Sequence, residues 1–272
     1  MKSYRRLPAI ISAAIIAIAA SGAQAVETIK IGGTGASNGM AGIAAEMYNR
    51  AQKDVTVKVV AGLGTSGGIR ALTAGALGVS FASRMLKEKE SGKGAVSAPY
   101  LRTPFVLVTS RTAASALDSK AVFAFYDDPH SKWSDGTPVK VILRPKSESD
   151  TTLLMNFFPG MEESLPKARA RGDIPVAQTD QDNATAAESI TGSLTMATWL
   201  QILSEKRKLQ PVTIDGAVPS VKTVADGTYP YSKTLYMVHA ENPTPAVAAF
   251  IAFLRSPEFA QELERNGAVL VE

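Results

Sequence analysis

Two successive units of strand, polar loop and helix occupy the sequence after residue 27. In each unit a short apolar run leads into a loop rich in Gly, Ser and Thr, and apolar residues at helical spacing follow. Repeated units of this kind predict an α/β fold with a mainly parallel sheet, in which ligands lie beyond the carboxyl ends of the strands. The predicted strands cover 28–31 and 55–60, the loops 32–39 and 61–68, and the helices 40–52 and 69–76.

Similar patterns continue along the rest of the chain. A loop is expected around 99–104, the apolar stretch 196–202 is expected to be buried, and 206–208 is expected to be a solvated turn. Further strands are predicted at 79–82, 105–109, 139–143 and 234–239, and further helices at 151–158, from 183 to 189, from 245 onward and at 257–266.

The first 25 residues have the layout of a secretory signal peptide. Three basic residues precede an apolar run over 9–20, and the string Ala-Gln-Ala at 23–25 has the small-x-small pattern that signal peptidase accepts. A run of about twelve residues spans roughly 18 Å as a helix, which is too short for a hydrocarbon core of about 30 Å. We therefore expect cleavage after residue 25 and a soluble protein in the periplasm, rather than an uncleaved anchor.

Composition excludes several classes of partner and site. Removing 25 of the 272 residues leaves 247, and because it removes three basic residues and no acid, the formal net charge falls from +4 to +1. A near-neutral protein gives no electrostatic reason to expect nucleic acid as a partner. The sequence has no cysteine and two histidines, so neither a thiolate site nor a multi-histidine metal site is expected, and no cofactor is predicted.

Three polar loops, at 35–38, 64–68 and 81–84, can direct hydrogen-bond donors at one anion. The first two lead into helices, whose N-termini present unpaired N–H groups and the positive end of the helix dipole. Glycine allows close backbone approach, and Ser and Thr add hydroxyl donors. A single such loop is equally well a plain helix cap; the combination of loops in one βα series predicts the anion site.

Arg144 directly follows the predicted strand 139–143 and enters a polar loop. A guanidinium can hold two oxygens of an oxyanion at once, although a structural ion pair is the alternative interpretation. Glu148 and Asp150 are either helix caps or selectivity groups. In an anion pocket, a carboxylate accepts the hydrogen of a protonated oxyanion and repels a fully deprotonated one.

No catalytic constellation can be assembled from these residues. A hydrolase would use Ser66 or Glu148, yet the string at 64–68 lacks the Gly-x-Ser-x-Gly spacing, and neither His130 nor His239 lies in a recognisable motif. The loop at 32–35 lacks the Lys-Ser/Thr pair of a nucleotide-binding loop. We therefore expect a binding protein rather than an enzyme.

Several strings in fixed order and spacing point to a known family. They are Gly-Thr-Gly-Ala-Ser at 33–37, Gly-Thr-Ser-Gly-Gly-Ile-Arg-Ala-Leu at 64–72, Phe-Ala-Ser-Arg-Met-Leu-Lys at 81–87, Lys-Trp-Ser-Asp-Gly at 132–136, Val-Ile-Leu-Arg-Pro at 141–145, and Asp-Gly-Thr-Tyr-Pro-Tyr-Ser-Lys at 226–233. Through them the chain resembles, over essentially its whole length after residue 25, the phosphate-binding proteins of ABC importers, which have the type II periplasmic binding fold.

The resemblance implies two α/β lobes, each a mainly parallel sheet flanked by helices, joined by two hinge strands. Lobe one would comprise 26–108 with 232–272, and lobe two 109–231. A small ligand would bind in the cleft and close it by a hinge motion. The implied ligand-binding residues are Ser37, Asn38, Thr65, Ser66 and Ser83 from lobe one, and Arg144, Glu148, Ser149 and Asp150 from lobe two.

The sequence departs from the family at 148–150, where Ser-Gly-Thr is usual and this chain has Glu-Ser-Asp. Some members carry an acid where Ser83 stands. Either one carboxylate has moved to the other lobe and still accepts a proton from phosphate, or the ligand is another oxyanion or oxyacid such as phosphite, arsenite, arsenate, sulfate or molybdate.

Two functions follow from the resemblance. The first is a periplasmic solute-binding protein that captures phosphate or a related oxyanion and delivers it to the permease of an ABC importer. The second is a sensory receptor of the same fold that binds a non-phosphate oxyanion or oxyacid and signals to a membrane kinase. By analogy with the fold, we expect a monomer.

Overall fold

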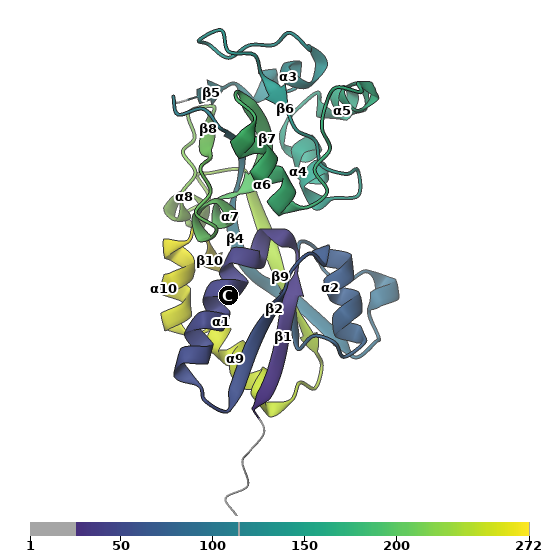
Figure 1. The fold of residues 1–272 in the computed structure, drawn as a ribbon, viewed down its shortest axis with the longest axis vertical. Coiled ribbons are helices and arrows are strands. Elements are labelled where there is room, and N and C mark those ends of the chain that lie inside the picture. Colours follow the sequence, from purple (N-terminus) through teal and green to yellow (C-terminus); the bar gives the residue numbers. More distant parts are fainter. Residues whose placement is uncertain (1–25, 114, 272) are drawn as a thin grey trace, which may run out of the picture.

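The computed structural model describes residues 26–113 and 115–271 and has two lobes stacked along its long axis (Figure 1). The predicted signal peptide, 1–25, lies outside the described residues. No helix within the described ranges is long and apolar enough to cross a membrane.

Lobe one, the lower half of Figure 1, is built around the parallel pairs β1–β2 and β1–β3. Ile29 and Ile31 on β1 are both buried, because alternate residues of a strand share one face. The lobe contains β1 (Glu27–Gly33), the 3-10 helix η1 (Gly35–Ser37), α1 (Asn38–Ala51), β2 (Val55–Val60), α2 (Gly64–Thr73), β3 (Val79–Ala82), η2 (Glu88–Glu90), α9 (Pro245–Leu254), α10 (Pro257–Arg265) and β10 (Val269–Leu270).

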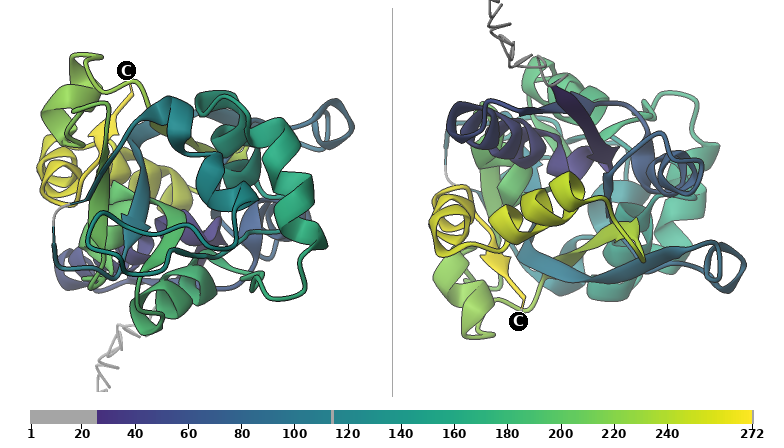
Figure 2. Two further views of the ribbon diagram at one scale, coloured as in Figure 1. Left: turned by 90° about the horizontal axis from the view of Figure 1, so that it is seen from above. Right: turned by 90° about the horizontal axis from the view of Figure 1, so that it is seen from below.

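Both faces of this sheet are covered. Helices α1, α9 and α10 pack together on one side, while α2 lies apart from them, as the view from below in Figure 2 shows. Tyr48 of α1 and Phe250 of α9 meet edge to face at 5.0 Å in the larger apolar cluster. A smaller cluster under α2 contains Ile69 and Leu72. The sheet edge that carries the polar loops is therefore held rigidly from both sides.

Two long strands connect the lobes: β4 (Ala95–Thr109) and β9 (Ser232–Ala240), which run antiparallel to each other. The predicted loop around 99–104 was wrong, because these residues belong to β4. The ladder accommodates Pro99 because its register shifts between Pro99 and Leu101, and a proline is tolerated where regular pairing is interrupted.

Lobe two, the upper half of Figure 1, mixes parallel and antiparallel pairing. β4 pairs antiparallel with β7 and β8, while β6–β7 and β5–β8 are parallel. One apolar cluster forms its core and includes Phe105, Leu154 and Met196. The lobe contains β5 (Ser115–Leu117), η3 (Ser119–Ala121), α3 (Ala124–Asp127), β6 (Lys140–Val141), α4 (Ser149–Phe157), α5 (Met161–Ala170), α6 (Asp180–Ser189), β7 (Ser193–Thr198), α7 (Trp199–Ser204), β8 (Gln210–Ile214) and α8 (Val221–Ala225).

Two helices begin at least three residues earlier than the sequence predicted. α2 begins at Gly64 rather than at residue 69, so the second polar loop forms the first turns of that helix. α6 begins at Asp180 rather than 183, because Thr179 and Asp182 form a capping box at its N-terminus. The apolar stretch at 196–202 is the end of β7 and most of α7. The proposed division of the lobes at 108/109 and 231/232 stays a prediction.

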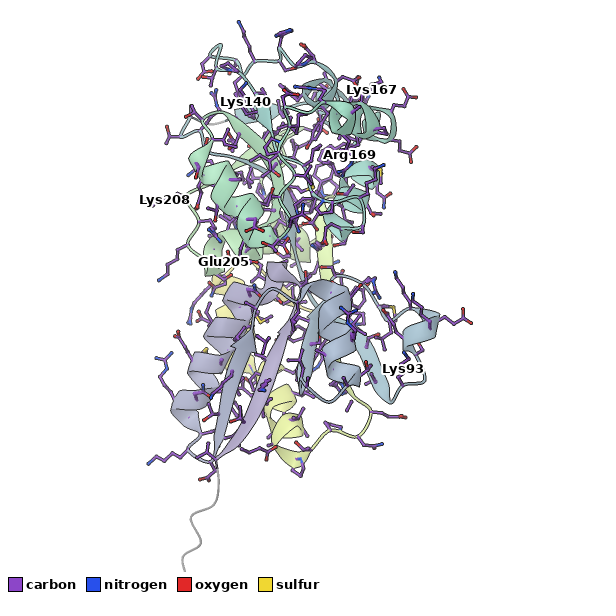
Figure 3. All side chains as sticks on the ribbon, turned by 45° about the vertical axis from the view of Figure 1, so that its right-hand side comes forward. Lys93, Lys140, Lys167, Arg169, Glu205 and Lys208 are labelled. Atoms are coloured by element: carbon purple, nitrogen blue, oxygen red, sulfur yellow. The ribbon has the colours of Figure 1, made fainter. Side chains whose placement is uncertain are left out.

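The lobes contact each other through η1 and α1 on one side and α6 and α7 on the other. The Nε2 of Gln181 on α6 donates to the carbonyl of Gly35, 2.9 Å away, and also to Glu205 at 2.6 Å. Figure 3 shows Glu205 at this junction. A Cβ atom on Gly35 would lie 2.4 Å from Oδ2 of Asp180, so only glycine allows this approach of the lobes.

Candidate functional site

The hydroxyl groups of lobe one meet at the carboxyl ends of β1 and β3. Thr34 and Ser83 share a hydrogen bond between their hydroxyl oxygens at 2.9 Å. The backbone N–H of Ser83 donates to Oγ1 of Thr65, also at 2.9 Å. This geometry follows from the parallel pairing, because the carboxyl ends of β1 and β3 lie at the same edge. The structure thus brings together Thr65 and Ser83, and it adds Thr34, which the list of candidates omitted.

Ser37 and Asn38 lie where η1 passes into α1, a helix of 14 residues. The Ser37 hydroxyl donates to the carbonyl of Thr34 at 2.8 Å and is buried. Oδ1 of Asn38 is buried and has no hydrogen-bond partner among the described residues. An unpaired acceptor is costly in such a position. The backbone N–H groups of Ser37 and Asn38 already donate to the carbonyls of Thr34 and Gly35, so the unpaired N–H donors of this helical segment are those at the start of η1. The segment therefore offers both donors and an acceptor.

Ser66 has a different environment from Thr65. Its Oγ accepts a hydrogen bond from the Arg84 guanidinium at 3.1 Å, and Arg84 also donates to both carboxylate oxygens of Glu90 at 2.7 and 3.0 Å. The hydrogen bonds from Arg84 are the main reason that the pKa of Glu90 is lowered to about 2. The structure therefore joins Ser66 to an ion pair. Its predicted contact with a ligand stays a prediction.

Arg144 is the largest side chain that the fold buries completely, with 2% of its surface exposed. Its Nη1 donates to the carbonyl of Ala177 at 2.8 Å, and its own carbonyl accepts from Arg169 at 2.6 Å. Figure 3 shows Arg169 in lobe two, on α5. Nε of Arg144 has no hydrogen-bond partner among the described residues. The guanidinium is thus fixed in direction by lobe two and still has an unused donor.

Two carboxylates flank the Arg144 guanidinium. Glu148 Oε2 and Asp180 Oδ1 each lie 3.6 Å from Nη2, which is within ion-pair distance and too long for a hydrogen bond. The side chain of Glu148 is 40% exposed, whereas that of Asp180 is 11% exposed. Arg144 therefore forms structural ion pairs, which was the alternative interpretation of this residue from the sequence. Its Nε remains available to another acceptor.

Ser149 and Asp150 begin α4, and the hydroxyl of Ser149 is 3.4 Å from Oδ1 of Asp150. Asp150 is buried, and its carboxylate forms a close ion pair with Nζ of Lys233 on β9. Both side chains are at most 5% exposed, so each needs the other to offset its lost hydration. The sequence analysis missed Lys233. It is the last residue of the string at 226–233, and its place in a predicted hinge segment was the only signal.

Asp180 is the second residue that sequence reasoning missed. It begins α6, and an acid at a helix start is ordinarily a dipole partner, so its sequence position gave no sign of a site. In the fold, however, Oδ1 of Asp180 faces Arg144, and Oδ2 faces Gly35 at the start of η1 in lobe one. Its backbone carbonyl accepts from the buried amide of Gln201 at 3.0 Å.

The pKa of Asp180 is raised, first by burial and then by the negative charge of Asp150. The cations Lys233 and Arg144 act in the opposite direction, and Glu148 adds a smaller upward shift. Three carboxylates therefore share two cations between the lobes. They do not form a metal centre, because no group of three or more His, Cys, Asp or Glu residues within 26–113 and 115–271 is placed to hold a metal ion.

A family model described as "PBP superfamily domain" matches residues 19–258. The chain belongs to the PBP superfamily. This confirms the resemblance inferred from the sequence and the two-lobed α/β fold that it implied. No curated protein matches the sequence.

Solved structures of other PBP-like proteins share this fold at low sequence identity. A putative phosphate ABC transporter substrate-binding protein with bound phosphate from Clostridium perfringens has a TM-score of 0.74 and 18% identity, covering 90% of this chain and all of its own. An ABC-type phosphate transport receptor from Vibrio cholerae has a TM-score of 0.62 and 19% identity, covering 89% and 100%. The periplasmic molybdate-binding protein of Azotobacter vinelandii has a TM-score of 0.59 and 14% identity, covering 90% and 100%.

Proposed function

We propose that this member of the PBP superfamily is a periplasmic solute-binding protein that captures phosphate or a related oxyanion between its lobes and delivers it to an ABC importer. One observation carries the proposal. The buried Arg144 guanidinium of lobe two has an Nε without a hydrogen-bond partner in the described part of the chain. Asp180 lies between this guanidinium and Gly35 of lobe one, near which the buried Oδ1 of Asn38 likewise has no partner in that part of the chain.

An oxyacid matches this arrangement chemically. Its oxygens can accept hydrogen bonds from Arg144, from the backbone amides at the start of η1 and from the hydroxyls of Thr65 and Ser83. Any hydrogen that it carries can be donated to Oδ1 of Asn38. The cost of removing the anion from water is offset only if nearly all its oxygens are paired, and donors from both lobes make this pairing feasible.

The proposal also fits the solved structures of the fold, two of which are described as phosphate transport proteins and one as a molybdate-binding protein. Export to the periplasm rests on the signal-peptide pattern at 1–25. The predicted binding residues are Ser37, Asn38, Thr65, Ser66, Ser83, Arg144, Glu148, Ser149 and Asp150, to which the geometry adds Thr34, Asp180 and Lys233 as candidates.

Binding is tested by calorimetry and thermal shift on the exported protein with phosphate, phosphite, arsenate, arsenite, sulfate and molybdate. A ligand at a hundredfold excess over its Kd should raise the free energy of unfolding by about 2.7 kcal/mol. Arg144→Ala should abolish the shift. Arg111→Ala is the matched control, since Arg111 is a buried arginine of lobe two that pairs with Asp135 and stacks on Trp133. Binding that survives in Arg144→Ala would refute the site.

Delivery to an importer is tested in cells. Deleting the gene should reduce uptake of the radiolabelled oxyanion that binds in vitro, and the wild-type gene should restore it while the Arg144→Ala gene should not. Uptake that is unchanged by the deletion, together with tight binding in vitro, would contradict the transport role and leave the binding role standing.

A further inference from the structure

Asp180 occupies a position that conflicts with simple anion capture. Its Oδ1 lies 3.6 Å from Nη2 of Arg144, and its Oδ2 would lie 2.4 Å from a Cβ atom placed on Gly35 of the opposite lobe. An oxyanion held by Arg144 and by the helix start behind Gly35 would therefore lie against this carboxylate. At close range two anions repel strongly, because the interior screens charge poorly.

The charges around Asp180 do not remove this conflict. Arg144 faces it from the loop before α4, Glu148 from the N-cap of α4, Asp150 from the first turn of α4, and Lys233 acts on it from β9. The 3-10 helix η1 contributes no titratable side chain, and Gln201 of α7 donates to the backbone carbonyl of Asp180 and not to its carboxylate. With every group ionised, three negative charges face two positive ones before any ligand arrives.

Asp180 is the member of this cluster most able to change its charge. Asp150 has the Lys233 ammonium as a close counterion, and Glu148 is 40% exposed and retains much of its hydration. Asp180 is buried, and no hydrogen bond from a described residue to its carboxylate holds the charged form. Burial also raises its pKa, so a proton binds there more readily than at an ordinary aspartate.

On the basis of the proposed function, we propose that Asp180 takes up one proton from solvent when the oxyanion binds, and that the resulting carboxylic acid donates a hydrogen bond to the anion. The proton cancels one of the three negative charges, frees the Arg144 guanidinium for the ligand and replaces a repulsive contact by an attractive one. Asp180 thereby couples affinity to pH and favours ligands that arrive together with a proton. It acts as a donor in the complex, not as an acceptor for a ligand hydrogen.

The experiment is calorimetry of inorganic phosphate and of sulfate at pH 8 in two buffers with different ionisation enthalpies, which counts the protons taken up. Wild-type protein should take up close to one more proton per phosphate than Asp180→Asn, whose amide imitates the protonated acid. Asp180→Asn should also bind phosphate more tightly than wild type at pH 8, by up to about tenfold for each pH unit above the pKa of the acid, and this advantage should shrink as the pH is lowered to 5.

Asp182→Asn is the matched control on the same helix, since Asp182 is exposed and caps α6, and it should leave both the proton count and the affinity unchanged. Should Asp180→Asn fail to fold, infrared difference spectra of wild type at pH 8 should show a protonated carboxyl band when phosphate is added. Weaker binding by Asp180→Asn at pH 8, or wild-type binding without the extra proton, overturns the inference and leaves the proposed function intact. No binding of any panel oxyanion at any pH overturns the proposed function itself.

Discussion

Replacing Lys233 by Met removes the partner of a buried carboxylate. The side chains of Lys233 and Asp150 are 2% and 5% exposed, so Asp150 would lose its counterion without gaining water. Breaking a buried pair in this way costs about 3–5 kcal/mol. The loss has an upper limit, because Asp150 can escape it by taking up a proton, which at pH 7 costs an aspartate of ordinary acidity about 4 kcal/mol. We therefore expect Lys233→Met to lower the free energy of unfolding by about 3–4 kcal/mol at pH 7.

The limit makes the prediction specific in its pH dependence. Protonation becomes easier by about 1.4 kcal/mol for each unit that the pH falls, so the penalty should shrink to about 1.5 kcal/mol at pH 5. The double variant Lys233→Met with Asp150→Thr removes the stranded charge and should recover most of the lost stability.

Urea unfolding followed by circular dichroism at pH 5, 6 and 7 measures these differences, provided that the slope against urea is unchanged. Lys167→Met is the control, because Lys167 forms an ion pair with Asp127 in which its own side chain is 61% exposed, and its loss should cost less than about 1 kcal/mol. A penalty for Lys233→Met below about 1 kcal/mol, or one that does not change with pH, would refute the reasoning that Asp150 depends on Lys233 for its charge.

Three further predictions concern other parts of the site. Glu90→Gln should lower the free energy of unfolding by about 1 kcal/mol at pH 7, because Arg84 lowers the pKa of Glu90 to about 2 in the folded protein. The extra stability of wild type is fully present above the pKa of Glu90 in the unfolded chain and is lost as the pH falls through about 2. Urea unfolding at pH 3 and pH 7 measures the difference. Gly35→Ala should weaken phosphate binding roughly tenfold or more, since its Cβ would lie 2.4 Å from Oδ2 of Asp180 and push the lobes apart, whereas Gly42→Ala, with nothing within 4 Å, should bind normally in calorimetry. Because burial raises the pKa of Asp180, this residue contributes most to stability at low pH, and the contribution is lost as the pH rises through its folded-state pKa. The fall in the free energy of unfolding between pH 5 and pH 8 should therefore be smaller in Asp180→Asn than in wild type. An equal fall in the two proteins would contradict a raised pKa at Asp180.

The sequence alone determined the features that depend on neighbouring residues. The predicted bounds of β2 at 55–60, which rest on alternating apolar residues, and of β3 at 79–82, which rest on a short apolar run, agree with the structure. Both patterns are local properties of the chain. The order of the glycine-rich strings identified the fold, and the convergence of Thr65 and Ser83 followed from the parallel order of the strands that precede them. The predicted helix starts were less accurate: α2 begins at Gly64 without a side-chain cap, and α6 begins at Asp180, after the capping box of Thr179 and Asp182.

Only the tertiary structure decided which charges share the space between the lobes. Lys233 and Asp150 are 83 residues apart in the sequence, and no periodicity or local motif connects them. In the sequence, Asp180 is indistinguishable from an ordinary acid at a helix start. Only the fold shows that it is buried beside Arg144 and opposite Gly35. The physical reason is that composition fixes the number of charges, while desolvation and Coulomb energy depend on burial and distance, which exist only once the chain has folded.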